Sequence, residues 1–266
     1  MGMARALTIA GSDSGGGAGI EADLKTFAAL GVYGTAAITG VTAQNTLGVQ
    51  AVELVSPEMV EKQIDSVLSD IGTDAAKTGM LGSAGIVRAA ARALRRWRVE
   101  RLVVDPVMVA KGGEPLLEPE ARQAVVDEIL PLALVVTPNL PEAAALAGRP
   151  VRSRADMEEA ARRIHALGPR WVVVKGGHLA EGRAVDLVYD GQGFFELDGE
   201  RIDTRHTHGT GCTFSATIAA GLARGLDVPA ALQRAKKVIS WAIAHAPGIG
   251  GGHGPTNHFF AHLADA

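Results

Sequence analysis

The chain has 266 residues, 47% of them hydrophobic, and a formal net charge of −3. This length and apolar content suffice for one large core, and we expect a single domain over residues 1–266. Aromatic residues make up only 4% and no Lys/Arg run forms a basic stripe, so we expect neither nucleic acid nor a membrane surface as a partner. The single cysteine, Cys212, cannot form an intrachain disulfide, which is typical of a cytoplasmic protein.

Short apolar runs alternate with segments of helical periodicity along the chain. In chain order, we expect a strand at 6–10, a helix at 18–30, a strand at 35–41, a helix at 57–70, a strand at 74–78, a helix at 84–97 and a strand at 102–104. A helix at 119–130, a strand at 134–137, helices at 140–147 and 154–167 and a strand at 171–175 follow. We then expect a hairpin of strands at 184–189 and 193–197, and two closing helices at 211–224 and 229–245.

Repeated strand–helix units predict an α/β fold with a mainly parallel central sheet and helices on both faces. Ligands of such folds lie beyond the carboxyl ends of the strands. Polar or glycine residues follow the predicted strands there: residues 11–13, Asp105, Asn139 and Lys175. The sequence therefore predicts a ligand site at this edge of the sheet.

A glycine-flanked turn, residues 208–213, precedes the first closing helix and is the strongest local signal. Backbone N–H groups at a helix N-terminus converge on one point and hold an anion, such as a phosphoryl group in transfer. The alternative is a plain helix start with glycines for the turn. Cys212 lies in this turn, where the helix N-terminus predicts a lowered thiol pKa. The alternative for Cys212 is a small buried apolar residue.

The first loop, residues 11–19, is rich in glycine but matches neither the dinucleotide fingerprint nor the P-loop. Its glycines either let the backbone approach a flat ligand or simply form a turn. Asp105, Asn139 and Glu142 carry the oxygen atoms that Mg²⁺ prefers, although Asn139 and Glu142 also have the spacing of a helix capping box. Lys175 leaves a β-branched strand beside two glycines, which suits either contact with phosphate or a stem buried along the surface.

Several short blocks together resemble one known family, in its order and over nearly the whole chain. They are GSD at 11–13, GGAGI at 16–20, ADLK at 22–25, TAQNT at 42–46, KTGML at 77–81, DPVM at 105–108, TPNLPEA at 137–143, KGGH at 175–178, THGTGCT at 207–213 and GP at 254–255. With these blocks the chain resembles the hydroxymethylpyrimidine/phosphomethylpyrimidine kinases of thiamin biosynthesis, in the ribokinase-like superfamily. One departure is His206, where asparagine is more usual before the Thr-His-Gly run.

The resemblance implies a ribokinase-like fold and a kinase that uses ATP and Mg²⁺. Its substrate would be 4-amino-5-hydroxymethyl-2-methylpyrimidine. The hydroxymethyl group would be phosphorylated first, and the monophosphate would then be phosphorylated again to the diphosphate.

The resemblance also implies roles for individual residues. Catalysis is implied for Cys212, Gly209, Thr210 and Gly211; substrate binding for Gln44, Gly11, Ala18, Asp23, Met80 and Val107; ATP binding for Lys175, Lys236, Asn139 and Thr210; and Mg²⁺ for Asp105 and Glu142. Cys212 falls where sugar kinases of the superfamily carry an aspartate base. The residue chemistry agrees, because a primary alcohol needs a base and the planar amide of Gln44 matches an aminopyrimidine edge.

Two other functions stay open at this point. A pyridoxal kinase is the nearest enzyme, since pyridoxine-type rings also carry a hydroxymethyl group. A catalytically silent vitamin-precursor binding protein is the alternative of a different class, against which the presence of Cys212, Asp105 and Lys175 argues. The oligomeric state is open as well, and a homodimer is one alternative.

Overall fold

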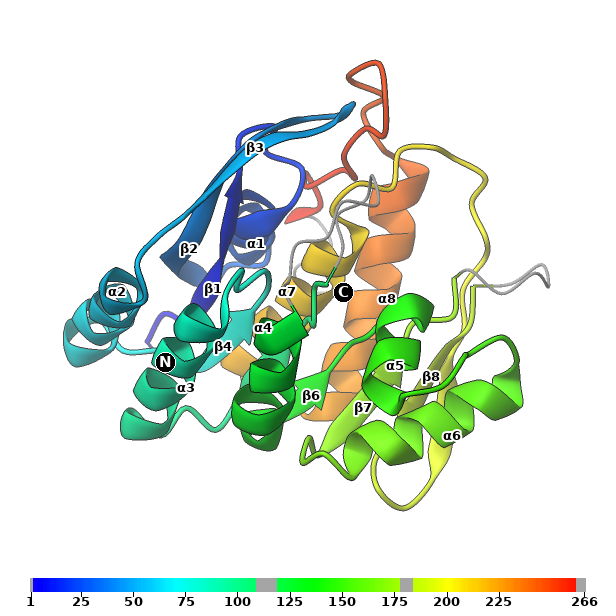
Figure 1. Cartoon of the computed structure of the whole chain (residues 1–266). Helices are drawn as coiled ribbons and strands as arrows, with labels where there is room; N and C mark the ends of the chain where they lie inside the picture. Colours follow the sequence, from blue (N-terminus) through cyan, green and yellow to red (C-terminus); the bar gives the residue numbers. More distant parts are fainter. Residues whose placement is uncertain (1, 109–118, 178–183, 262–266) are drawn as a thin grey trace.

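The structure is a computed structural model of the chain and describes residues 2–108, 119–177 and 184–261 (Figure 1). Nine strands of these residues form one sheet in the order β3-β2-β1-β4-β5-β6-β7-β8-β9. Pairing is parallel from β2 to β7 and antiparallel for β3, β8 and β9, which confirms the mainly parallel sheet. The strands are β1 Arg5–Asp13, β2 Tyr33–Asn45, β3 Gly48–Leu54, β4 Ala75–Thr78, β5 Leu102–Val104, β6 Val135–Val136, β7 Trp171–Val174, β8 Asp186–Tyr189 and β9 Phe194–Leu197.

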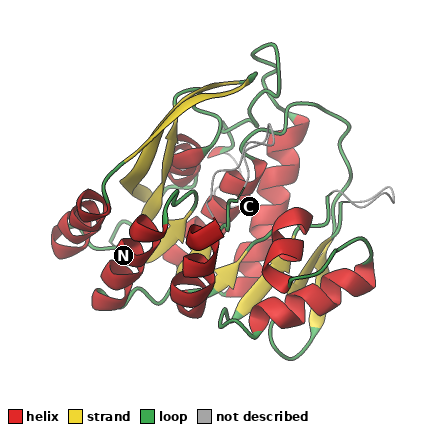
Figure 2. Ribbon diagram, in the orientation of Figure 1, coloured by secondary structure: helices red, strands yellow, loops and turns green. Residues whose placement is uncertain are grey.

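Helices cover both faces of this sheet (Figure 2). Alternate residues of the central strands point to opposite faces, so Leu102 and Val104 belong to one hydrophobic core and Val103 to the other. The first core is completed by α2 Pro57–Asp70, α3 Ala84–Arg96, α4 Pro119–Ala124, α5 Leu140–Ala147 and α6 Arg154–His165. The second is completed by α1 Gly19–Ala29, α7 Thr210–Ala223 and α8 Val228–Ala244. The α/β fold with helices on both faces is therefore confirmed.

Short polar side chains fix the starts of several helices. Each accepts a hydrogen bond from the N–H group three residues on, as at Ser56, Ser83, Asn139, Ser153 and Asp227. By contrast, α1 and α7 begin at Ala18 and Gly209 without a side-chain cap. The N–H groups at these two helix starts are thus left for other partners.

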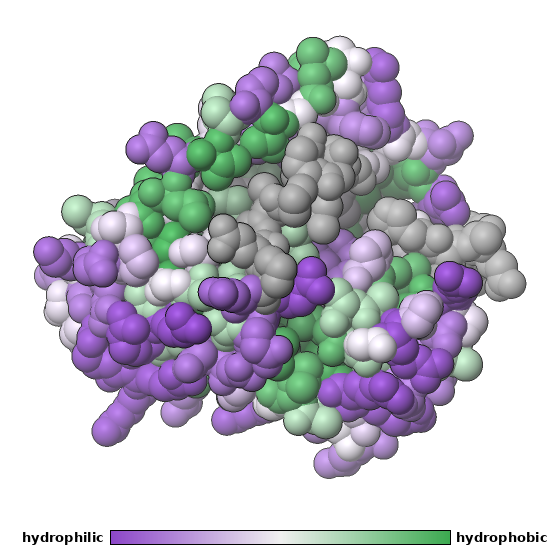
Figure 3. Space-filling view, viewed as in Figure 1, coloured by the Kyte–Doolittle hydropathy of each residue, from purple (hydrophilic) through white to green (hydrophobic). Residues whose placement is uncertain are grey.

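The main difference from the sequence prediction is β3, which was not expected. The strand β2 continues past its predicted end and pairs antiparallel with β3. Most side chains of β3 are exposed, so the segment lacks the alternation of buried and exposed positions by which strands are predicted. Apolar side chains gather over β2 and β3 (Figure 3), among them the exposed Val41, Val52 and Leu54. The homodimer left open by the sequence stays a prediction.

A second difference concerns the predicted helix at 119–130. The α-helix ends at Ala124, a π-helical turn covers Val125–Ile129, and a 3₁₀ turn covers Leu130–Leu132.

Within the described ranges, none of the helices combines the length and apolarity needed to cross a bilayer.

Candidate active site

Polar residues from four strands meet at one edge of the sheet. Asp13 ends β1, Asp105 follows β5, and Lys175 follows β7. Beyond β6, Asn139 lies beside Lys175 in a short parallel bridge, and the N–H group of Lys175 donates to the carbonyl of Pro138 at 2.8 Å. The prediction that these residues share the carboxyl edge of the sheet is confirmed.

The turn before α7 has the geometry of an anion-binding site. Gly209 lies in the left-handed region with φ +77°, and a side chain there would run into the carbonyl of Gly17. Thr210 turns its hydroxyl back to the carbonyl of Thr207 at 2.6 Å. Among the described hydrogen bonds, the N–H groups of Gly211 and Cys212 have no backbone acceptor. Free N–H groups at the positive end of a helix attract an anion.

The thiol of Cys212 lies between the starts of two helices. It belongs to the first turn of α7 and lies near the N–H group of Gly19, the first residue of α1. Burial nevertheless raises the pKa of Cys212 to about 11; Lys77 opposes the shift, and the carboxylates of Asp23 and Asp105 add to it. The expected lowering of this pKa is therefore wrong, because burial and two carboxylates outweigh the helix starts.

Asp105 and Lys175 form an ion pair that faces the turn. The Nζ atom of Lys175 lies 3.0 Å from Oδ1 of Asp105, whose side chain is 3% exposed. A Cβ atom built on Gly211 would lie 3.2 Å from Nζ of Lys175 and 3.3 Å from Oδ2 of Asp105. An ammonium, a carboxylate and the free N–H groups of the turn thus converge on one point.

Glu142 and Asn139 form the capping box that their spacing predicted. Oδ1 of Asn139 accepts from the N–H group of Glu142 at 2.9 Å, and Oε2 of Glu142 accepts from the N–H group of Asn139 at 2.8 Å. Burial raises the pKa of Glu142 to about 7; Lys175 lowers it and Asp105 raises it further. Glu142 therefore both starts α5 and titrates near neutral pH.

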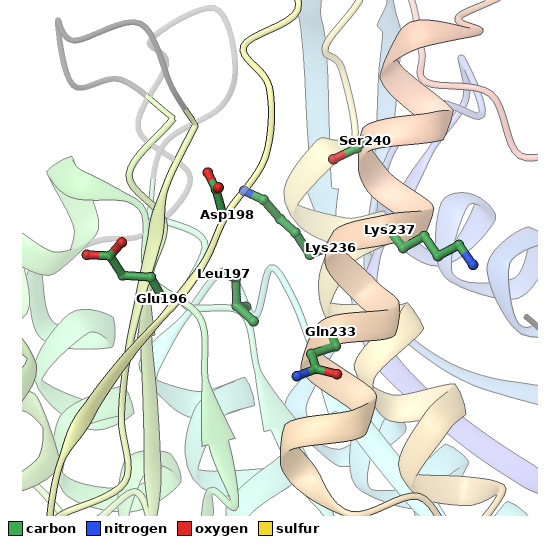
Figure 4. A pocket seen from close by; sticks show the side chains of 7 residues that line it. All are labelled: Glu196, Leu197, Asp198, Gln233, Lys236, Lys237 and Ser240. Atoms are coloured by element: carbon green, nitrogen blue, oxygen red, sulfur yellow. The ribbon is translucent and has the colours of Figure 1, made fainter.

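Lys236, expected to contact ATP, is held in an ion pair. Its Nζ atom lies 2.8 Å from Oδ2 of Asp186, whose Oδ1 accepts from the N–H group of Gly176 at 3.0 Å. It lines a cavity of about 240 Å³ between α8 and the end of β9 (Figure 4). The lining residues are Glu196, Leu197, Asp198, Gln233, Lys236, Lys237 and Ser240.

Two histidines lie outside the described residues. They are His178, the last residue of the KGGH block that the chain shares with the family, and His262 near the end of the chain.

The residues expected to bind the pyrimidine come together in part. A side chain on Gly11 would run into the methyl group of Met80, and Val107 donates its N–H group to the carbonyl of Asp105 at 2.8 Å. Gln44, at the end of β2, has its amide nitrogen 3.4 Å from the ring of His208. The N–H group of Ala18 instead donates to a carboxyl oxygen of Asp13 at 2.9 Å.

Asp23 does not line a surface, because its side chain is fully buried. It lies 2.8 Å from Nζ of Lys77, also fully buried, and 2.6 Å from the hydroxyl of Thr8. Burial opposes the charge of Lys77, but nearby anionic groups, Asp23 foremost, outweigh burial and raise the pKa of Lys77. No role was predicted for Lys77; the available signal was one lysine among the apolar residues of a short strand.

Comparisons with known proteins agree with this geometry. The family model described as phosphomethylpyrimidine kinase matches residues 13–257. The hydroxymethylpyrimidine/phosphomethylpyrimidine kinase of Rhizobium meliloti is 54% identical over 257 residues, 96% of each chain. The thiamine biosynthesis bifunctional protein of Geobacter sulfurreducens is 51% identical over 255 residues, and the match spans 96% of this chain but only 52% of that protein.

A solved structure has the same fold as this chain. An ADP complex of Bacillus subtilis pyridoxal kinase superposes with a TM-score of 0.92 at 44% identity, covering 98% of this chain and all of the other. Since the family model covers most of the chain and relatives share about half of its residues, the similarity extends from fold to sequence. The chain belongs to the phosphomethylpyrimidine kinase family, with a ribokinase-like fold.

Proposed function

We propose that the chain transfers the γ-phosphoryl group of ATP to the hydroxymethyl group of 4-amino-5-hydroxymethyl-2-methylpyrimidine, and then phosphorylates the monophosphate to the diphosphate. The observation that carries this proposal is the convergence of the α7 turn with Lys175 and Asp105. Positioned N–H groups and an ammonium stabilise the charge of a transferring phosphoryl group. The names of the relatives supply the substrate.

In the first transfer, the hydroxymethyl oxygen bonds to the γ-phosphorus and the bond from that phosphorus to the ADP oxygen breaks. The hydroxyl proton passes to Cys212, and the N–H groups of Gly211 and Cys212 hold the phosphoryl oxygens. Lys175 neutralises phosphate charge from the side of β7, with Asn139 and Thr210 beside it. Lys236 acts at a distance in this scheme, because its ion pair with Asp186 holds the N–H group of Gly176 next to Lys175.

The second transfer differs in its nucleophile. A phosphate oxygen of the monophosphate attacks the γ-phosphorus of a second ATP, and ADP leaves again. This oxygen is already ionised near neutral pH, since the second pKa of a phosphate monoester is about 6. No hydroxyl proton has to be removed, so the second transfer does not need Cys212 as a base.

The residues of the site fit a magnesium ion held mainly by water and phosphate. Within the described ranges no group of three or more His, Cys, Asp and Glu could hold a metal by itself. Asp105 and Glu142 are two buried carboxylates close enough to raise the pKa of Glu142. One or two carboxylates with substrate phosphates are the usual magnesium ligands of phosphate-transferring enzymes. Bound there, Mg²⁺ would neutralise charge on the phosphates of ATP.

The pKa of Glu142 predicts a pH-dependent demand for Mg²⁺. Below pH 7 the carboxyl is largely protonated and neutral, so the concentration of Mg²⁺ for half-maximal rate should rise on going from pH 8 to pH 6. Glu142→Gln keeps an oxygen for the capping box but removes the charge. We expect it to need more Mg²⁺ at pH 8 and to lose the pH dependence. Magnesium titrations of the rate at both pH values test this, and an unchanged dependence in Glu142→Gln would limit Glu142 to capping.

Replacing Gln44 tests the substrate assignment. Because a buried pyrimidine amine without a partner costs about 1–3 kcal/mol, Gln44→Ala should raise KM for the pyrimidine by about 5- to 150-fold and leave KM for ATP near its original value. Steady-state kinetics with each substrate varied in turn measure both values. Gln50→Ala, on the exposed strand β3, is the matched control. Equal losses for both substrates would contradict the assignment.

A pyridoxal kinase is the second candidate, because a structure named for that activity shares the fold and 44% of its residues with this chain. Both substrates offer a hydroxymethyl group on a six-membered aromatic ring. Mass analysis of products from hydroxymethylpyrimidine and pyridoxine, run side by side with Mg-ATP, separates the two. Phosphorylation of pyridoxine alone would overturn the proposed function, and no phosphorylation of either would favour a silent binding protein.

A further inference from the structure

A relay of polar contacts runs from Asp13 through His208 to Gln44, and the reaction scheme above uses only its last member. Nε2 of His208 lies 2.8 Å from Oδ2 of Asp13 and 3.4 Å from Nε2 of Gln44. The three residues come from the end of β1, the turn before α7 and the end of β2. The side chain of Asp13 is 4% exposed and that of His208 is 12% exposed. Water therefore competes little for these hydrogen bonds.

Asp13 determines the proton on its side of His208. Its carboxylate accepts from the N–H groups of Gly15, Gly17 and Ala18 at 2.8, 3.1 and 2.9 Å. Burial works against the charge, but His208 and these N–H groups outweigh it and lower the pKa of Asp13. An ionised oxygen at 2.8 Å requires a proton on Nε2 of His208. The one proton of Nε2 thus points to Asp13, and Nε2 keeps no lone pair that could accept a hydrogen bond from Gln44.

Thr42 determines the other end of the Gln44 amide. Its hydroxyl has one proton and lies 2.9 Å from the carbonyl of Ser12, which can only accept. The same hydroxyl lies 3.1 Å from Oε1 of Gln44. Because its proton goes to Ser12, Thr42 offers Gln44 only a lone pair. The group of Gln44 that suits Thr42 is the amide nitrogen.

Both neighbours require the same orientation of the amide. Two conflicts arise with Oε1 toward Thr42 and Nε2 toward His208. The single proton of the Thr42 hydroxyl then faces two acceptors, the carbonyl of Ser12 and Oε1 of Gln44. The amide nitrogen of Gln44 and the protonated Nε2 of His208, both donors, lie 3.4 Å apart. Turning the amide by half a rotation removes both conflicts, because the nitrogen then donates to Thr42 and the oxygen, in place of a second N–H donor, faces Nε2 of His208. The two ends of an amide have nearly the same shape, so the hydrogen-bond network decides between them.

We propose that Asp13 and His208 are positioning residues which, together with Thr42, fix the amide of Gln44 in this orientation and thereby select a 4-aminopyrimidine over a 4-oxopyrimidine. The inference rests on the proposed function, in which Gln44 contacts the pyrimidine edge. In the fixed orientation, one lone pair of Oε1 is free to accept from the 4-amino group. One proton of Nε2 is free to donate to ring nitrogen 3.

A 4-oxopyrimidine presents the opposite pattern at the same edge. Its exocyclic oxygen accepts and its ring N3–H group donates, so it needs the amide the other way round. Turning the amide would lose the hydrogen bond to Thr42 and set the amide nitrogen against Nε2 of His208, which has no lone pair to accept from it. The relay thus rejects the oxo analogue through the contacts that hold Gln44, without an additional contact to the ligand.

The test compares kcat/KM for the 4-amino substrate and its 4-oxo analogue, each with saturating Mg-ATP. We expect the wild-type protein to prefer the amino compound by at least about a hundredfold. His208→Ala removes the protonated nitrogen that keeps the amide nitrogen of Gln44 turned away, so this preference should fall by about tenfold, through KM for the two pyrimidines and not through KM for ATP. His208→Gln places an NH₂ group near the position of Nε2 and should restore most of the preference.

Two further variants keep the test independent of any folding defect. Thr42→Val keeps the shape of the side chain, removes the other partner of the amide and should lower the preference in the same direction. His253→Ala is the matched control, since its Nδ1 atom lies 3.1 Å from the carbonyl of Arg205 and its loss should leave the preference unchanged.

The outcomes distinguish the inference from the proposed function. Equal losses of kcat/KM for both pyrimidines in His208→Ala and Thr42→Val would overturn the inference and make His208 a structural link between loops. A wild-type protein that phosphorylates neither pyrimidine would overturn the proposed function itself. A wild-type protein that turns over both equally would leave the kinase standing and overturn the selection.

Discussion

Cys212→Ser should slow the first phosphoryl transfer by about 10²–10⁴, the usual loss when a general base is removed. The second transfer should slow far less, because its nucleophile is an ionised phosphate oxygen that has no proton to give up. Single-turnover measurements with saturating substrates, once with the hydroxymethylpyrimidine and once with its monophosphate, give the two rates separately. The second rate is an internal control for folding and for ATP binding.

The raised pKa of Cys212 adds a pH signature to this prediction. The base form is the thiolate, whose fraction grows tenfold per pH unit below a pKa of about 11, so the first-step rate should rise steadily from pH 6 to pH 9. Cys212→Asp introduces a carboxylate that is ionised throughout this range, and it should regain part of the activity with a nearly flat profile. A near-wild-type first step in Cys212→Ser would remove Cys212 as the base and leave the N–H groups of the turn as the catalytic device.

Lys77→Met should lower the free energy of unfolding by about 3–5 kcal/mol, because it leaves the carboxylate of Asp23 buried without its partner. Equilibrium urea unfolding followed by circular dichroism measures the loss. Arg95→Ala is the matched control: its ion pair with Glu128 is 2.6 Å long but both side chains are more than a third exposed, so about 0–1 kcal/mol is expected.

Removing both charges gives the decisive comparison for this pair. The variant Lys77→Met with Asp23→Leu replaces two buried charges by apolar groups, and it should recover much of the stability that Lys77→Met loses. If Lys77→Met costs no more than Arg95→Ala, the buried pair does not stabilise the fold in the way its geometry indicates. A loss in the double variant as large as in Lys77→Met would point to the packing of the introduced apolar side chains as the cause.

The sequence was a good guide to the fold wherever burial follows a regular period. The helix at 57–70 and the strand at 102–104 have the predicted bounds, because caps and apolar runs mark both ends. The strand β3 escaped prediction since its side chains face water on most positions, and a pairing partner rather than a buried face defines it. The π-helical turn after Ala124 has no signal in local composition either.

The location of the site could be predicted from the sequence, but the pKa values of its residues could not. Asp105, Asn139 and Lys175 could be placed together because parallel strands end at one edge. The pKa of Cys212 was predicted in the wrong direction, because the helix start is visible in the local sequence, whereas burial and the carboxylates of Asp23 and Asp105 come from the folded structure. The roles of the individual site residues in binding and catalysis stay predictions.

The contact of Gly209 with Gly17 has a consequence for synthesis on the ribosome. All nine strands of the sheet precede residue 198, whereas the turn before α7 comes later, and residues 254 and 256 hydrogen-bond to His208 later still. A nascent chain can therefore form the sheet while one face still lacks α7 and α8 and the glycine loop, residues 11–19, still lacks its contact with Gly209. The turn before α7 is made only with the last quarter of the polypeptide, so premature termination yields a sheet with an open apolar face, a form that chaperones bind and proteases remove.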